Sequence, residues 1–232
     1  MTQPIIRFEG VSKAFGTQTV LRDFSLDVEP GAFVSIIGRS GCGKTTVLKL
    51  VNGLLSPDTG RVLIQGQDVA RIDPVALRRR IGYAIQNVGL FPHMTVEKNI
   101  AYVPAISGLK EWKGKQCREK VAALLKQVGL DPALAGRYPR ALSGGQRQRV
   151  GIARALAAGP ELLLMDEPFG AVDEITRGQL QDELLRIHRE SGITVLFVTH
   201  DIAEALKLGT RTLVMDAGQI QQYDAPSRLL AH

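Results

Sequence analysis

A glycine-rich loop that ends in a lysine and a threonine is the first feature of this sequence that could do chemistry. The segment Gly38–Thr45 fits the spacing G-x-x-x-x-G-K-T. The candidate binding residues are Gly38, Ser40, Gly41, Cys42, Gly43, Lys44, Thr45 and the next residue, Thr46. A short apolar run, Ala32–Ile37, precedes the loop, and a helical pattern, Thr45–Leu54, follows it. Glycines let backbone N–H groups face phosphate oxygens, and a helix start adds a positive end. The pattern therefore predicts a nucleotide phosphate site.

Individual residues of this loop have expected roles. Lys44 should reach the β- and γ-phosphates, the Thr45 hydroxyl should bind Mg²⁺, and Thr46 should lie near the α-phosphate. The alternative is a glycine-rich turn with an accidental lysine. The four fixed positions arise by chance in roughly one chain in a hundred at average glycine usage. We therefore favour nucleotide binding.

Two neighbouring acids follow the apolar run Leu162–Met165. Mg²⁺ prefers one carboxylate together with phosphate oxygens, and Asp166 at the strand end suits that role. Glu167 points the other way and can polarise a water for in-line attack on the γ-phosphate. Without the phosphate loop, two solvated acids in a turn would be the better interpretation. Beside that loop, the pair predicts hydrolysis.

Two further polar residues follow strand candidates. His200 comes just after Thr194–Val198, at the sheet edge where α/β proteins collect ligands, and is expected to hold the γ-phosphate and the attacking water. Gln86 ends Ile81–Ile85 in the same way, and its amide could bridge Mg²⁺ and water. Both interpretations depend on the phosphate loop.

A second serine- and glycine-rich segment begins another helical pattern. Leu142 is followed by Ser143, Gly144, Gly145 and Gln146, and the helical run is Arg147–Ala158. A Ser/Gly-rich helix start is a second anion site, far along the chain from the first. Two such sites in one subunit make sense if each nucleotide lies between the loop of one copy and this segment of another, in a symmetric dimer.

The elements that position these residues can be read from the hydrophobic pattern. Short apolar runs that suit a parallel sheet covered on both faces are Ala32–Ile37, Ile81–Ile85, Leu162–Met165, Thr194–Val198 and Thr212–Met215. Turn residues at Asp58–Gly60 and Ala217–Gly218 predict hairpins. A smaller antiparallel sheet is expected from Ile5–Phe8, Ser25–Val28 and Arg61–Ile64. From about residue 88 to 160 helical patterns replace strands, including Cys117–Val128 and Arg147–Ala158.

In this order the motifs closely resemble the ATP-binding subunit of ABC transporters, over nearly the whole chain. The resemblance identifies Gly38–Thr46 as Walker A, Gln86 as the Q-loop, Leu142–Gln146 as the signature, Leu162–Glu167 as Walker B, Ala171–Asp173 as the D-loop and His200 as the switch histidine. It implies Glu167 as general base, Asp173 acting across the dimer, and Phe15 stacking on adenine. For Phe15, packing in the core is the alternative.

The resemblance also implies the fold and its division. We expect an α/β fold with a P-loop NTPase (RecA-like) core, an antiparallel β-subdomain and an inserted α-helical subdomain. Residues 1–232 would be one ABC ATPase domain, with the core and β-subdomain at 1–87 and 160–232 and the helical subdomain at 88–159. The substrate and metal cofactor implied are ATP and Mg²⁺.

Finer features resemble the osmoprotectant branch of importers, for glycine betaine, choline or carnitine. These are the segments Gln86–Pro92, Gly170–Arg177 and Asp201–Leu208. An importer of amino acids, polyamines or other solutes is an alternative, as is a soluble ABC ATPase without a transport role or a regulator that does not hydrolyse ATP. Expected partners are a second copy or a paired ATPase, a membrane-spanning permease and, indirectly, a solute-binding protein. Nucleic acid is not expected as a partner.

Composition sets outer limits on this interpretation. The chain has 232 residues and a formal net charge of +6, which alone does not choose among nucleotide, lipid and nucleic acid. Neither an 18-residue apolar run nor a signal-peptide pattern is present, so we expect a soluble protein that is not exported by that route. The resemblance to importer ATPases implies a peripheral place at the cytoplasmic face of a bacterial or archaeal membrane. Cys42 and Cys117 are expected as reduced thiols. The apolar residues Val88, Leu90, Phe91 and Met94 either belong to the core or receive a helix of a membrane partner.

Overall fold

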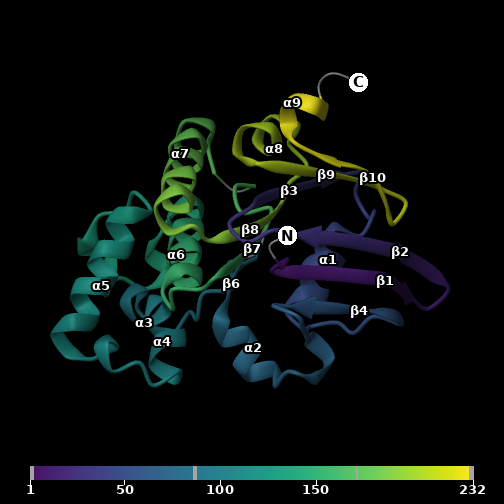
Figure 1. Cartoon of the computed structure of the whole chain (residues 1–232). Helices are drawn as coiled ribbons and strands as arrows, with labels where there is room; N and C mark the ends of the chain where they lie inside the picture. Colours follow the sequence, from purple (N-terminus) through teal and green to yellow (C-terminus); the bar gives the residue numbers. More distant parts are fainter. Residues whose placement is uncertain (1–2, 86–87, 171, 230–232) are drawn as a thin grey trace.

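A six-stranded sheet forms the centre of the computed structural model, which describes residues 3–85, 88–170 and 172–229 (Figure 1). Its strand order is β10-β9-β3-β8-β7-β6. The strands are β3 (Phe33–Gly38), β6 (Ile81–Ala84), β7 (Leu162–Asp166), β8 (Thr194–Val198), β9 (Arg211–Asp216) and β10 (Gln219–Asp224). All neighbours pair in parallel except β9 and β10. The predicted parallel sheet is confirmed, as is the hairpin turn at Ala217–Gly218.

A second, antiparallel sheet has the order β2-β1-β4-β5. It consists of β1 (Ile6–Phe15), β2 (Gln18–Val28), β4 (Thr59–Ile64) and β5 (Gln67–Asp68). The three predicted strands are confirmed, but the hairpin expected at Asp58–Gly60 is wrong. Thr59 and Gly60 already belong to β4, which pairs with β1, and the chain reverses later, between Ile64 and Gln67.

The segment between β6 and β7 is helical, as predicted. The α-helices in the described part of the chain are α1 (Lys44–Val51), α2 (Pro74–Arg80), α3 (Val96–Ile100), α4 (Tyr102–Ile106), α5 (Gly114–Gln127), α6 (Gly144–Leu156), α7 (Glu174–Ser191), α8 (Ile202–Leu208) and α9 (Pro226–Leu229). Short 3₁₀ turns are η1 (Val69–Arg71), η2 (Lys110–Trp112), η3 (Pro132–Gly136) and η4 (Pro139–Ala141). The division of the chain at residues 88 and 159 stays a prediction.

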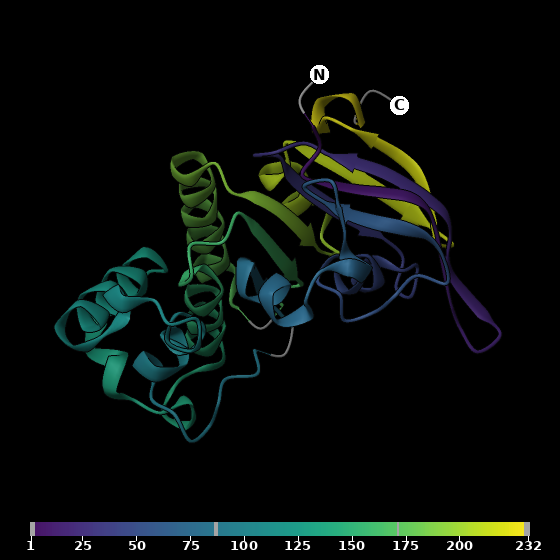
Figure 2. The same cartoon turned by 60° about the horizontal axis from the view of Figure 1, so that its bottom comes forward.

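Two apolar clusters cover the two faces of the central sheet, because successive strand residues point to opposite sides. Leu163, Val195 and Phe197 face a cluster that includes residues of α3, α5, α6 and α7. Leu164 and Leu196 face a cluster that includes α1 and the antiparallel sheet. In Figure 2 the helices α3–α6 and the strands β1 and β2 accordingly lie on opposite sides of the central sheet. None of the helices within the described ranges has the length and apolar character that a membrane span needs.

Candidate active site

Three neighbouring parallel strands end at one edge of the central sheet and deliver most of the predicted site residues. β3 leads into the glycine-rich loop, β7 into Asp166 and Glu167, and β8 into Thr199 and His200. An open cavity of about 640 Å³ lies there. It is lined by Phe15, Gln18, Val20, Ser40, Gly41, Gly43, Lys44, Thr45, Thr46, Glu167 and His200.

The glycine-rich loop is closed tightly around its own lysine. Lys44 Nζ donates to the carbonyl oxygens of Gly38 at 2.7 Å and of Arg39 at 3.0 Å. The Arg39 side chain is exposed. Gly43 has φ 106°, and a Cβ there would lie 2.9 Å from the Val20 carbonyl oxygen, so this position requires glycine. The loop therefore curves around the Lys44 side chain and holds it at the cavity wall.

Thr45 and Asp166 form the one direct side-chain contact between the loop and β7 among the described hydrogen bonds. Thr45 Oγ1 donates to Asp166 Oδ1 at 3.0 Å, and Asp166 is 8% exposed. The pKa of Asp166 is raised, mainly by burial and further by the nearby Glu167 charge. The hydrogen bond from Thr45 acts in the opposite direction and lowers this pKa. A hydroxyl and a carboxylate side by side are hard oxygen donors of the kind Mg²⁺ prefers, so this pair fits the predicted metal.

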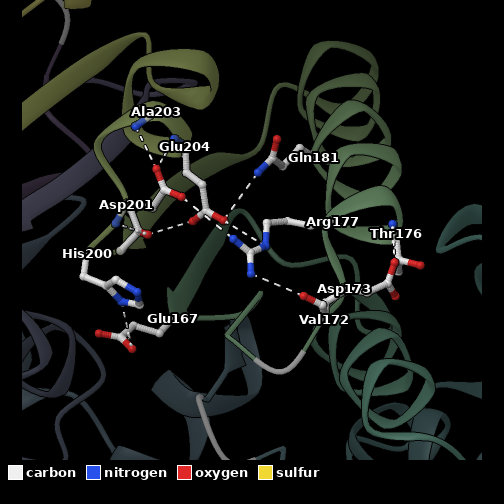
Figure 3. A network of polar contacts seen from close by, with 11 residues as sticks. Glu167, Val172, Asp173, Thr176, Arg177, Gln181, His200, Asp201, Ala203 and Glu204 are labelled. Atoms are coloured by element: carbon white, nitrogen blue, oxygen red, sulfur yellow. Dashed lines mark hydrogen bonds and ion pairs between the residues drawn. The ribbon is translucent and has the colours of Figure 1, made fainter.

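Glu167 and His200 both line the cavity, and their side chains point toward each other (Figure 3). His200 Nδ1 lies 3.4 Å from Glu167 Oε2. Glu167 adopts φ 46°, and its N–H donates to the Val198 carbonyl at 2.9 Å. A non-glycine residue in this region costs about 1–3 kcal/mol and is a common feature of functional sites. The backbone thus turns sharply after Asp166 and presents Glu167 toward the loop.

The signature segment lies at a different cavity, of about 600 Å³. Ser143, Gly145, Gln146 and Asp173 line it, together with Thr176 and Arg149. Ser143 Oγ accepts from Gln146 N at 3.2 Å and Gln146 Oε1 accepts from Ser143 N at 3.0 Å, a capping box that begins α6. Gly144 is the first residue of α6. The two predicted anion sites therefore do not meet within one chain.

The remaining predicted residues differ in how they are placed. Phe15 is 48% exposed at the rim of the first cavity, with Lys13 Nζ 5.7 Å from its ring centroid, so the core-packing alternative is wrong. Cys42 and Cys117 are free and buried. Gln86 lies outside the described residues. Sequence reasoning missed Gln18 and Val20, which come from β2; only the pairing of β2 beside the loop could have indicated them.

Comparison with known proteins places this geometry in a family. The family described as "ABC transporter" matches residues 21–170. The chain belongs to this family. It is 47% identical over 227 residues to the glycine betaine/carnitine/choline transport ATP-binding protein OpuCA of Bacillus subtilis, covering 97% of this chain and 59% of that protein. It is 48% identical over 226 residues to the glycine betaine uptake system ATP-binding protein YehX of Escherichia coli, covering 97% and 72%.

Solved ABC cassettes have the same fold. A dimeric structure of the bacterial ABC transporter cassette MJ0796 matches with a TM-score of 0.89 and 34% identity, covering 95% of this chain and 98% of that one. A second dimer of MJ0796, in a post-hydrolysis state with ADP and Pi, has a TM-score of 0.88 and 33% identity over the same shares. The predicted P-loop NTPase fold is thereby confirmed. The chain spans about three fifths of the length of OpuCA, the first of the curated relatives it matches.

Proposed function

We propose that this chain is the ATP-hydrolysing subunit of an ABC importer that takes up a small quaternary ammonium osmoprotectant. The observation that carries the ATPase proposal is the single cavity that holds the Walker A loop, Glu167 and His200. These groups come from three separate strands, so their meeting in one cavity is a property of the fold and not of one motif.

The loop and its neighbours would bind the nucleotide. Lys44 and the loop N–H groups would hold the β- and γ-phosphates, and the half-exposed Phe15 would stack on the adenine. Thr45 and Asp166, and by the family resemblance Gln86, would hold Mg²⁺. When bound, this ion would neutralise charge on the β- and γ-phosphate oxygens. These residues therefore position the γ-phosphate in front of Glu167.

Glu167 would act as the general base. A water attacks the γ-phosphorus and gives a proton to the Glu167 carboxylate, while the bond from the γ-phosphorus to the β,γ-bridging oxygen breaks and leaves ADP and phosphate. His200 lies beside Glu167 and would hold the γ-phosphate and the attacking water. The strained backbone of Glu167 would keep its carboxylate directed into the cavity.

A second copy would complete each site. Ser143, Gly145, Gln146 and Asp173 line a cavity that, among the described residues, shares no lining residue with the nucleotide cavity, so they would act on the nucleotide of another copy. In a two-fold symmetric pair, the signature cavity of one copy would cover the nucleotide in the other. The dimeric cassettes of MJ0796 support such a pair.

The solute is proposed from relatives, because transported molecules do not touch this subunit. Those 45–48% identical include proteins for glycine betaine, carnitine, choline and osmoprotectant transport. Relatives for other solutes have similar sequence identity to this chain. The spermidine/putrescine import protein PotA of Chromobacterium violaceum is 43% identical, and the sulfate/thiosulfate import protein CysA of Caulobacter vibrioides is 45% identical. Uptake of labelled glycine betaine by the intact transporter, in competition with spermidine and with sulfate, would decide among them.

The membrane partner would dock on the loop after Gln86. Val88, Leu90, Phe91 and Met94 are all partly buried, which leaves apolar surface on each. Phe91 packs its ring 4.7 Å from that of Tyr102. This loop would receive a short helix of the permease, with the chain peripheral at the cytoplasmic face of a bacterial or archaeal membrane and a solute-binding protein outside.

Glu167→Gln tests the ATPase proposal. We expect phosphate release to fall by about 100-fold or more, because general base catalysis contributes that much. An ATP-bound dimer should accumulate on gel filtration. Glu161→Gln is the matched control, since Glu161 precedes the opposite end of β7 and is exposed. If Glu167→Gln hydrolyses ATP as fast as Glu161→Gln, Glu167 is not the base; if the wild-type chain releases no phosphate, the proposed function is wrong.

A further inference from the structure

A polar network joins the first turn of α7 to the segment that carries His200 (Figure 3). At its centre is Arg177. The guanidinium donates to the Val172 carbonyl at 3.3 Å, with Arg177 Nη1 3.8 Å from Asp201 Oδ2 and Nε 3.7 Å from Glu204 Oε1. One side chain therefore contacts the backbone just before Asp173 and two carboxylates just after His200.

The carboxylate of Glu204 extends the network toward His200. Glu204 is 6% exposed and accepts from Thr199 Oγ1 at 2.7 Å and from Gln181 Nε2 at 3.4 Å. Thr199 Oγ1 in turn accepts from Asp201 N at 3.0 Å, so it closes the turn that contains His200. A buried carboxylate is costly unless it is paired and hydrogen-bonded. Arg177 thus stabilises the group that fixes the backbone on both sides of His200.

The network lies between the two cavities. Asp173 and Thr176 line the signature cavity. In the sequence, Asp173 directly follows Val172 and Thr176 directly precedes Arg177. Glu167 and His200 line the nucleotide cavity. Asp173 Oδ1 accepts from Thr176 N at 3.0 Å, so the residues of the signature cavity are rigidly joined to the helix turn that carries Arg177. A displacement of Asp173 would therefore move Arg177, and with it the partners of Glu204.

We propose that Arg177 is a positioning residue that couples the two cavities of one chain. A nucleotide that fills the signature cavity would shift Asp173 and Val172, and Arg177 would pass this shift through Glu204 and Thr199 to His200. This rests on the proposed function, because in the symmetric pair the nucleotide at the signature cavity belongs to the other copy. A nucleotide bound at one site of the pair would then affect the His200 of the other site, and such a coupling between sites is reciprocal.

The test compares Arg177→Met and Arg177→Lys with the wild-type chain. Lys keeps the charge, but its single ammonium lacks the fork that contacts the carbonyl and both carboxylates. For both variants we expect kcat to fall by about tenfold and the Hill coefficient for ATP to approach about 1, while the affinity for a fluorescent ATP analogue stays within about twofold of wild type. Loss of kcat without loss of binding separates a positioning role from general damage to the fold.

Lys207→Met is the matched control. Lys207 Nζ also bridges α8 and α7, through Asp182 Oδ1 at 2.7 Å, but it contacts neither Val172 nor Thr199. This variant should keep the kcat and Hill coefficient of wild type. The inference is overturned if Arg177→Lys keeps both values, or if Lys207→Met loses them equally.

Amide hydrogen exchange supplies a readout that does not need turnover. With a non-hydrolysable ATP analogue, Arg177→Lys should exchange faster than wild type in residues 172–177 and 199–205 together, whereas Lys207→Met should leave 172–177 unchanged. Unchanged exchange in Arg177→Lys would overturn the coupling. A wild-type chain without phosphate release would overturn the proposed ATPase instead, so the two failures can be told apart.

Discussion

Alanine at Gly43 should destabilise the chain far more than alanine at Gly41, although both glycines belong to the same loop. Both have positive φ, 106° and 78°. A Cβ at Gly43 would lie 2.8 Å from Leu21 Cδ2 and 2.9 Å from the Val20 carbonyl oxygen, whereas a Cβ at Gly41 meets nothing within 4 Å. Because Leu21 is fully buried, its side chain cannot simply move away.

The magnitude follows from separating strain from overlap. Each substitution pays about 1–2 kcal/mol for an L-residue in the left-handed region. Each regains about 0.4–1 kcal/mol because alanine restricts the unfolded chain. Only Gly43→Ala adds the cost of overpacking, about 1–3 kcal/mol. The first two contributions are similar in the two variants, so the difference in unfolding free energy between them should be about 1–3 kcal/mol.

Urea unfolding followed by circular dichroism measures this difference directly, since the midpoint shifts while the slope stays constant when only stability changes. Both variants should be measured without nucleotide, so that binding does not contribute. Equal midpoints for Gly43→Ala and Gly41→Ala would refute the reasoning. They would mean that β2 does not pack against the loop as described.

Two other substitutions test the nucleotide cavity. Asp166→Asn should raise the melting temperature of the nucleotide-free chain at pH 7 and have little effect near pH 3. Burial raises the pKa of Asp166 in the folded chain above its ordinary 3.8, so the wild-type chain loses stability as the pH rises through that folded pKa. The amide of Asp166→Asn does not ionise, so the variant avoids this loss. Equal effects of the substitution at both pH values would contradict the reasoning. Phe15→Ala should weaken ATP-analogue binding by about 2–10-fold without changing the melting temperature, because the ring is half exposed. Leu54→Ala, equally exposed, is its control, and equal affinities of the two variants would remove Phe15 from the site.

The main sheet could be predicted because its strands are buried on both faces and therefore appear as continuous apolar runs. The residues at their ends could be predicted too, since parallel neighbours end at one edge. Asp58–Gly60 was misread for a physical reason: Asp58 does not close a turn. Its carboxylate accepts from Ala14 N and Lys13 Nζ on β1. The sequence alone does not show whether a turn-type side chain such as that of Asp58 closes a local turn or accepts hydrogen bonds from a neighbouring strand.

The bridge at Arg177 could not be found from the sequence for a similar reason. Its partner Asp201 caps the N-terminus of α8 and its partner Glu204 lies within α8, so only the packing of α7 against α8 brings them to Arg177. On a helix surface, sequence patterns indicate partners three or four residues apart, as for Arg186 with Glu183 and Glu190. Contacts between helices have no such spacing, so the network appears only in the folded chain.

The start of α6 explains why a nucleotide from another copy would fit at the signature cavity. The capping box already satisfies the N–H groups of Ser143 and Gln146. The glycines between them have no side chain to cover the first turn, and a Cβ at Gly145 would meet nothing within 4 Å. Backbone N–H groups at a helix start attract anions when they stay accessible. Within the described residues, the two cavities share no lining residue, so a phosphate bound at this helix start would belong to a nucleotide held by another copy.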